Sequence, residues 1–575
     1  MQAAQLTNDG SPWVDYDLQQ NLSQSVTPDA RDDFYLYVNH DWLTNAKIPE
    51  GMSSANSFQE IEDETVKNAK AILEDKTLKG HDAKLIQTLN DEFLNWTARD
   101  KAGIKLLKPT VKAIKKISSM KELSDFICNF GDLTYGVPTF INLGNASGIS
   151  DSSSYVTYVS GDGLILGDAA EYTKRTELGD RYYKAYRKEA VTMLKRLGYS
   201  SKEAGKMFDR VITFEGKLAK VSYTSDDMMN PDYIQKINNI MKKDKTEKLM
   251  KNFPLKRYLK ASGYGNSKQY CIQNPAYLKQ LDKLYTKKNL NVIKEYMLVH
   301  YVLEMTSMLD RKAFDLNIQT ANAINGSSGK LSDKEYAYYT VSSMLSVPMQ
   351  KVYLKKYNAS EKKEKITQIC QKVIDNYRQM LSKATWLSEP TRQKAVEKLD
   401  AIKINAVYPE QWEDYSKLKL DGKSYFECSK AIVYYEVKKN QACANQKVDK
   451  NQWLMNTLES NAYYDKIVAF NGQPVSGANV QGEAIADITA MQCILGIAEA
   501  DSNFDYDKFF KQYAKLWKRV NTPELEYLCL MQDTHPLHYL RTNVTVQQFD
   551  EFYDTYQVQK GDKMYLAPED RITVW

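Results

Sequence analysis

The sequence predicts a mainly helical protein built from two domains. A chain of 575 residues is too long for a single hydrophobic core, which favours two. Between about residues 57 and 399, apolar residues recur at every third or fourth position, as in residues 60–73 and 182–197, and this is the period of an amphipathic helix. β-type patterning is confined to residues 138–143 and 154–159, which predict a small hairpin around a Gly- and Ser-rich connection.

Two turn signals suggest where the domains meet. An aromatic-rich amphipathic helix over residues 32–43 stops before Pro49-Glu50-Gly51. The long helical run ends near Leu399 and is broken at Tyr408-Pro409. We therefore expect residues 1–52 and 405–575 to form one discontinuous domain, and residues 53–404 to form a helical domain that carries the hairpin.

Composition excludes several classes of protein. Lys and Arg number 78 against 73 Asp and Glu, so the net charge of +5 gives no support for a nucleic-acid partner. The 7 cysteines are isolated, with no Cys-x-x-Cys pair, which favours buried free thiols over disulfides. The sequence contains no run of about 20 apolar residues, so it predicts no transmembrane segment. The polar start of the sequence lacks the basic and apolar regions of a signal peptide.

Two acidic residues near the C-terminus are candidates for a site. Glu483 and Asp487 are four residues apart within an Ala- and Ile-rich segment, so they share one face of a mostly buried helix. Buried carboxylates need partners because an unpaired charge is costly to bury. The pair could be a metal ligand with an orienting carboxylate. It could equally cap backbone groups or bind Lys or Arg, and spacing alone favours this second interpretation.

Three residues beyond this helix, and one segment before it, can each be given either a functional or a purely structural role. His535, held by Asp533, could hydrogen-bond the oxyanion of a tetrahedral intermediate, or could be an ordinary loop histidine beside Pro536. Arg541 could bind a substrate carbonyl or carboxylate, or form a structural salt bridge. Upstream, Asn461-Ala462-Tyr463-Tyr464 predicts a short strand, which could pair with an extended peptide or be a plain edge strand.

The order of these motifs along nearly the whole chain resembles the neprilysin family of zinc metallopeptidases, in particular its bacterial oligopeptidase branch. The matching stretches are residues 32–43, Asn230-Pro231, residues 386–399 and 408–410, residues 453–455 and 461–464, residues 482–487, Asp533, His535, Arg541 and Asn543, and residues 564–575.

The resemblance implies a fold and a set of residue roles. The fold is a thermolysin-like (gluzincin) catalytic domain, here truncated, that faces a larger helical domain. By resemblance Glu483 is the glutamate zinc ligand and Asp487 orients a histidine ligand. His535 stabilises the transition state and Arg541 contacts substrate backbone. Asn461 and Ala462 belong to the substrate-docking strand.

The chain departs from the family pattern at one place. The family's His-Glu-x-x-His helix supplies two zinc ligands and the general base, and it lies between the docking strand and the Glu-x-x-x-Asp helix. Here only residues 465–482 lie between them, and they contain no histidine and resemble a loop. The five histidines of the chain are His40, His81, His300, His535 and His538.

These observations lead to three hypotheses. The first is a neprilysin-like family member that has lost peptidase activity, binds no zinc and still binds oligopeptides or a partner. The second is an active zinc oligopeptidase for which this sequence lacks an internal segment. The third is a non-catalytic helical protein that binds peptides or another partner. We expect a monomer, located in the cell envelope or outside the cell if a signal has been removed, and in the cytoplasm otherwise.

Overall fold

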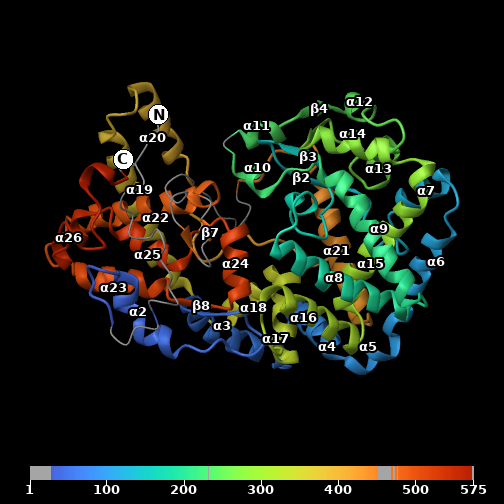
Figure 1. Cartoon of the computed structure of the whole chain (residues 1–575), viewed down its shortest axis with the longest axis horizontal. Helices are drawn as coiled ribbons and strands as arrows, with labels where there is room; N and C mark the ends of the chain where they lie inside the picture. Colours follow the sequence, from blue (N-terminus) through green and yellow to red (C-terminus); the bar gives the residue numbers. More distant parts are fainter. Residues whose placement is uncertain are drawn as a thin grey trace. The chain divides into compact units, whose positions relative to one another are not determined.

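A computed structural model describes residues 27–230, 232–450 and 477–572, together with Leu22 and the residue pairs 468–469 and 473–474. The chain divides into two compact units (Figure 1). Unit 1 comprises Met1–Asn68, Leu354–Trp412 and Asn451–Trp575, and unit 2 comprises Ala69–Tyr353 and Glu413–Lys450. Most described residues are helical, which confirms the predicted fold class.

The division differs from the boundaries expected at residues 52 and 405, because the chain passes between the units four times. Residues 354–404, expected in the helical domain, lie in unit 1, where α19 (Ser360–Lys383) packs on α22 (Gly477–Ala498). The Asn376 side-chain amide donates to the Cys493 carbonyl at 2.9 Å across this contact. Residues 413–450 lie in unit 2, because α21 (Tyr425–Ala442) packs on α4 (His81–Leu94).

The described part of unit 1 is helical apart from two short pairs of strands, β1–β8 and β6–β7, both antiparallel. Its other described elements are α2 (Phe34–Asn45), β1 (Ser54–Asn56), α3 (Ser57–Glu74, which continues into unit 2), α20 (Glu389–Asp400), β6 (Val468–Ala469), β7 (Gln473–Pro474), α23 (Tyr506–Leu516), β8 (Arg519–Asn521), α24 (Pro523–Gln532), α25 (His538–Val546), α26 (Asp550–Tyr556) and η7 (Pro568–Asp570).

The N-terminal helix α2 completes the core of unit 1. Asp33 caps it by accepting a hydrogen bond from the Leu36 N–H at 3.0 Å, as favoured at a helix start. Phe34 and Tyr35 are fully buried, and the Phe34 ring lies 4.9 Å from the ring of Phe552 on α26. Figure 1 shows α2 in blue beside α23 in red, so segments from the two ends of the chain share one core.

Unit 2 contains a four-stranded sheet, with strand order β2-β3-β5-β4, among many helices. The predicted hairpin is confirmed, since β2 (Ile141–Ser147) pairs antiparallel with β3 (Tyr155–Gly161), and Leu143 lies opposite Val159. The sequence did not predict β4 (Ile240–Lys242) and β5 (Gln269–Ile272), which are too short to show a clear alternating pattern.

The remaining elements of unit 2 are helices. They are α5 (Trp96–Ala102), η1 (Gly103–Leu107), α6 (Lys108–Lys116), α7 (Met120–Ile127), η2 (Ala169–Tyr172), α8 (Glu177–Arg196), α9 (Ser201–Ala219), α10 (Ser225–Met229), α11 (Tyr233–Ile237), α12 (Lys243–Thr246), α13 (Leu255–Ala261), α14 (Pro275–Leu284), η3 (Lys287–Asn289), α15 (Leu290–Met305), η4 (Thr306–Met308), α16 (Arg311–Asn325), α17 (Asp333–Met344) and α18 (Ser346–Lys356), whose end reaches unit 1.

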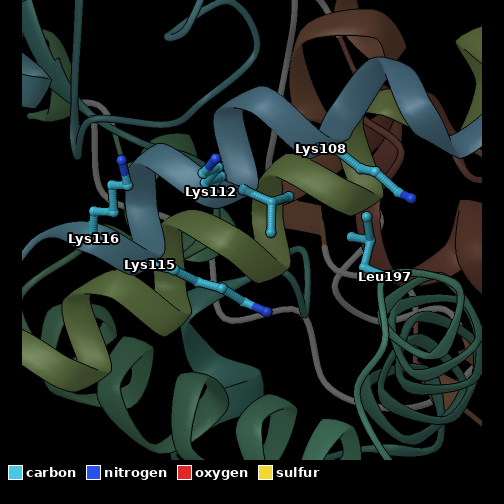
Figure 2. A pocket seen from close by; sticks show the side chains of 6 residues that line it. Lys108, Lys112, Lys115, Lys116 and Leu197 are labelled. Carbon is cyan, nitrogen blue, oxygen red and sulfur yellow. The ribbon is translucent and has the colours of Figure 1, made fainter.

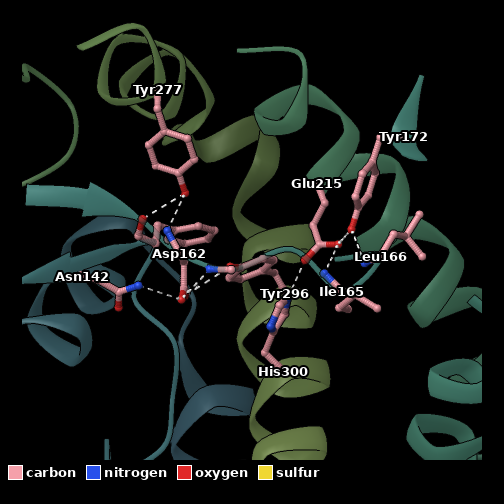
Figure 3. Close-up of polar contacts among 11 residues, drawn as sticks. Asn142, Asp162, Ile165, Leu166, Tyr172, Glu215, Tyr277, Tyr296 and His300 are labelled. Atoms are coloured by element: carbon pink, nitrogen blue, oxygen red, sulfur yellow. Dashed lines mark hydrogen bonds and ion pairs between the residues drawn. The ribbon is translucent and has the colours of Figure 1, made fainter. Parts of the chain in front are cut away.

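A charged pair lies in the interior of unit 2 (Figure 3). The carboxylate of Glu215 on α9 is fully buried and lies 2.5 Å from Nε2 of His300 on α15. The Tyr172 hydroxyl donates to the same carboxylate, and the Ile165 N–H approaches it at 3.4 Å. Burial alone would lower the pKa of His300, but the Glu215 charge outweighs it and raises that pKa.

Candidate functional site

The two acidic residues singled out in the sequence lie on α22. Glu483 and Asp487 are each only 9% exposed, although they are surrounded along the helix by buried apolar residues such as Ala484 and Ile488. α22 packs on α25, which places both carboxylates against the N-terminal part of that helix. As predicted from their spacing of four, the two acids share one face.

Arg541 on α25 is the principal partner of these acids. Its Nε and Nη2 donate to the two carboxylate oxygens of Asp487 at 2.7 and 2.8 Å. Nη2 also lies 3.5 Å from Oε2 of Glu483. The guanidinium stacks on the Trp517 ring, with its carbon 3.8 Å from the ring centre, and the Tyr513 hydroxyl donates to the Arg541 carbonyl. The Arg541 side chain is therefore held in one position.

His535 joins the same cluster from the loop between α24 and α25. Its Nδ1 lies 2.7 Å from Oδ1 of Asp533, and its backbone N–H donates to that oxygen at 3.0 Å. Its Nε2 lies 3.3 Å from Oε2 of Glu483. The five side chains thus form a continuous chain of charged and polar contacts from Asp533 through His535, Glu483 and Arg541 to Asp487.

The local environment changes the pKa values of this cluster. The hydrogen bond to Asp533 raises the pKa of His535, which favours the imidazolium form. Burial would raise the pKa of Asp533, but the two hydrogen bonds from His535 outweigh burial and hold that pKa below its usual range. Burial raises the pKa of Asp487, and the Arg541 guanidinium counteracts it. The cluster therefore places two cationic groups among three carboxylates.

The structure brings together five of the seven residues expected in the site. Asn461 and Ala462 lie outside the described residues, so the expected docking strand is not described. Trp517 and Tyr513 were missed, although their spacing of four at the end of an amphipathic helix could have indicated an aromatic support. His538 is buried against Tyr35 and takes no part in the described cluster, and burial lowers its pKa to about 3.

The residues of this cluster do not fit a zinc ion. A zinc site needs three or four ligands arranged around an open centre. Within residues 27–230, 232–450 and 477–572, no group of three or more His, Cys, Asp and Glu side chains could hold a metal. The Glu483 oxygen that would face a metal instead faces His535 and Arg541.

Within the same ranges, no helix is both long and apolar enough to cross a membrane.

Comparison with known proteins gives a consistent result. Residues 30–409 and 433–572 match the two domain models of peptidase family M13. The chain is 24% identical to a neutral endopeptidase of Lactococcus lactis subsp. cremoris, over 95% of this chain and 99% of the relative. That alignment runs over 638 residues although the whole chain has 575, so the relative contains residues with no counterpart here. Neprilysin-3 of Drosophila melanogaster is also 24% identical, over 85% of this chain and 66% of the relative.

Two solved structures share the fold. The zinc metalloprotease Zmp1 of Mycobacterium tuberculosis, in complex with an inhibitor, superposes with a TM-score of 0.85 at 18% identity, covering 96% of this chain and 99% of that chain. PepO from Lactobacillus rhamnosis superposes with a TM-score of 0.81 at 19% identity, covering 95% and 100%. Given the matches to both domain models, the chain belongs to peptidase family M13, the neprilysin family of zinc-dependent metallopeptidases.

Proposed function

We propose that this member of family M13 binds oligopeptides but does not hydrolyse them, and that its catalytic centre persists as an ion cluster without zinc. One observation carries the proposal. The carboxylate of Glu483, the family's zinc ligand by resemblance, lies 3.3 Å from His535 Nε2 and 3.5 Å from Arg541 Nη2. Two protein cations thus neutralise the carboxylate that a metal ion would otherwise neutralise.

The sequence supports the same conclusion on chemical grounds. Hydrolysis by a zinc peptidase needs three protein ligands, an activated water and a general base. In the family pattern two histidines and a glutamate of one helix supply two ligands and the base. This chain has no histidine between His300 and His535, so these groups have no counterpart before Glu483. One carboxylate does not hold zinc firmly enough for catalysis.

The residues that remain can still contact a peptide. His535, held by Asp533, provides an imidazole at the site, and Arg541 lies beside it with its guanidinium hydrogen-bonded to Asp487. By family resemblance Asn461 and Ala462 would add main-chain hydrogen bonds to an extended peptide. We therefore assign binding roles to these groups, and no chemical step.

Metal analysis and a peptidase assay test the proposal. The full chain is dialysed against ZnCl2 and then buffer, its zinc is measured, and labelled oligopeptides are incubated with it and weighed by mass spectrometry. We expect far less than one zinc per chain and an unchanged peptide mass. A measurement of peptide diffusion should show that the labelled peptide diffuses more slowly when the chain is present, because it is bound. One zinc per chain that is lost in Glu483→Gln but kept in Glu499→Gln, with cleavage abolished by a chelator, would refute it.

A second function is favoured by a separate observation. Glu483, Asp487, His535 and Arg541 are all retained, and the Lactococcus relative contains residues with no counterpart in this chain. Both facts fit an active zinc oligopeptidase whose gene encodes a further internal segment. Sequencing the genomic DNA between the codons for Tyr464 and Asp465 decides between the two. An open reading frame there with a His-Glu-x-x-His motif would favour the active enzyme.

A further inference from the structure

A hollow of about 350 Å³ lies on the surface of unit 2 beside helix α6 (Figure 2). Four lysines surround it, and Val111 and Leu197 provide its apolar surface. In Figure 2 Lys108 and Leu197 lie toward one end of α6, and Lys115 and Lys116 lie toward the other. Lys108 and Lys116 are eight positions apart, so they are separated by about 12 Å along the helix axis. The four lysines are Lys108, Lys112, Lys115 and Lys116.

These lysines carry positive charge that nearby carboxylates leave unneutralised. Among the described residues, none of the four has a carboxylate within 4 Å, in contrast to the many lysines of this chain that form ion pairs. The Lys115 ammonium lies 4.1 Å from the centre of the Tyr199 ring. Hydrogen bonds from Ser200 at the start of α9 lower the pKa of Glu203, and the charge of Lys115 adds to this, so Glu203 offsets part of the positive charge without forming an ion pair with Lys115.

The usual structural role of such lysines is already filled by another residue. Lysines in the last turn of a helix commonly neutralise its C-terminal carbonyl groups. Here Lys294, on α15, donates to the carbonyls of Lys115 and Ile117 at 3.0 and 2.5 Å. Lys115 and Lys116 therefore extend from a helix end that already has its own cation, and they add to the positive charge around the hollow.

The shape and chemistry of the hollow select its ligand. A compact phosphate is usually held by backbone N–H groups at a helix N-terminus. This hollow instead runs along the side of α6 from its first residue, Lys108, to its last, Lys116, and the apolar residues Val111 and Leu197 also line it. An extended ligand with several separated negative charges can reach lysines spread over about 12 Å. Because an extended peptide rises about 3.3 Å per residue, four or five residues span this distance.

We propose that this hollow binds a short acidic peptide segment, whose carboxylates contact the lysines of α6 and whose central apolar side chain packs on Val111 and Leu197. The site uses no residue of the candidate functional site in unit 1. Its existence does not depend on whether the chain hydrolyses peptides.

Fluorescence anisotropy with the full chain tests this binding. The probe is a labelled, N-acetylated and C-amidated Glu-Glu-Leu-Glu-Glu peptide, compared with its Gln-Gln-Leu-Gln-Gln counterpart in 20 mM NaCl. We expect saturable binding of the acidic probe only, weakened severalfold by 300 mM NaCl because salt screens exposed charges. Equal binding of both peptides, or no saturable binding of either, would overturn the proposal.

Matched variants locate the site. Lys112→Gln/Lys116→Gln removes two charges with a spacing of four, and Lys279→Gln/Lys283→Gln removes two exposed lysines with the same spacing on α14. We expect about five- to tenfold weaker binding for the first pair and less than twofold change for the second. Circular dichroism checks that both variants fold. Equal affinities of the two folded variants would contradict the assignment to α6.

Two further measurements separate the apolar contact from simple charge attraction. Leu197→Ser keeps every lysine. We expect this substitution to weaken the binding of the leucine-containing probe but not the binding of Glu-Glu-Ser-Glu-Glu. Unlabelled tripolyphosphate is the competitor. Displacement of the probe by tripolyphosphate at lower concentrations than by the unlabelled acidic peptide would identify a phosphate site and refute the peptide site.

Discussion

Arg541 and Asp487 form an ion pair with two hydrogen bonds, from Nε to Oδ2 at 2.7 Å and from Nη2 to Oδ1 at 2.8 Å. Both side chains are about 10% exposed, so the pair is well shielded from water. In the family pattern Asp487 orients a histidine ligand, and in this chain its carboxylate is satisfied by an arginine of the neighbouring helix. The pair links α22 to α25 and neutralises part of the buried negative charge.

Arg541→Met should therefore destabilise unit 1. Among the described residues, the substitution leaves His535 as the one cation beside the buried Asp487 and Glu483, and breaking a buried ion pair costs about 3–5 kcal/mol. Urea unfolding followed by tryptophan fluorescence measures the free energy of unfolding. Arg378→Met is the control, because Arg378 pairs with Asp375 and Asp400 at an exposed site, where water screens the charges and the loss should be much smaller.

The double variant Arg541→Met/Asp487→Leu tests the same explanation from the other direction. If the loss in Arg541→Met comes from uncompensated charge, removing the partner as well should restore part of the stability, since apolar replacement of a buried pair is often close to neutral. Additive losses in the double variant would show instead that α22 and α25 depend on these side chains for packing alone.

Asn543→Ala should weaken the attachment of the N-terminal helix. The buried Asn543 amide accepts from the Tyr35 N–H and donates to Oδ1 of Asp33, both at 2.8 Å. Without it the Tyr35 N–H loses its acceptor and the Asp33 carboxylate loses one of its donors, so we expect a loss of about 2–3 kcal/mol. The exposed Asn45→Ala on the same helix should cost less than about 0.5 kcal/mol. Equal losses in the two urea titrations would contradict this role.

The His300–Glu215 pair should make unit 2 less stable as pH rises. The folded state raises the pKa of His300, so the stabilisation is complete below the unfolded pKa of about 6.5 and is lost as pH rises through the folded pKa. We expect the free energy of unfolding to decrease above about pH 6.5 in the wild type. His300→Gln should be less stable at pH 6 and show a flatter pH dependence.

His81→Gln is the control for this titration. His81 also lies in unit 2 and contacts the Tyr415 carbonyl at 2.9 Å, and no described carboxylate pairs with it as Glu215 pairs with His300. The variant should keep the pH dependence of the wild type. Glu215→Gln should flatten the profile as His300→Gln does. A wild-type slope that survives in both His300→Gln and Glu215→Gln would assign it to other groups.

Local patterns in the sequence predicted many elements correctly, for a physical reason. The helical period depends on which side chains face a core, and it identified α8. The helix carrying Glu483 and Asp487 was predicted instead from its motif and its Ala- and Ile-rich flanks. β-branched alternation identified the β2–β3 hairpin. Short strands of three or four residues carry too little pattern, so β4 and β5 were missed. The segments that hold α19, α20 and α21 were assigned to the other domain, because a turn signal marks a break but not which core follows it.

By itself the sequence determined that the chain is mainly helical, that Glu483 and Asp487 share a helix face, and that no histidine pair precedes them. Only the tertiary structure decided which groups meet those acids. Asp487 and Arg541 are 54 residues apart along the chain, and their pairing depends on how α22 and α25 pack. Side-chain periodicity reports the face that an element buries, whereas the partner of a buried charge depends on contacts between elements distant in sequence, which no local pattern specifies.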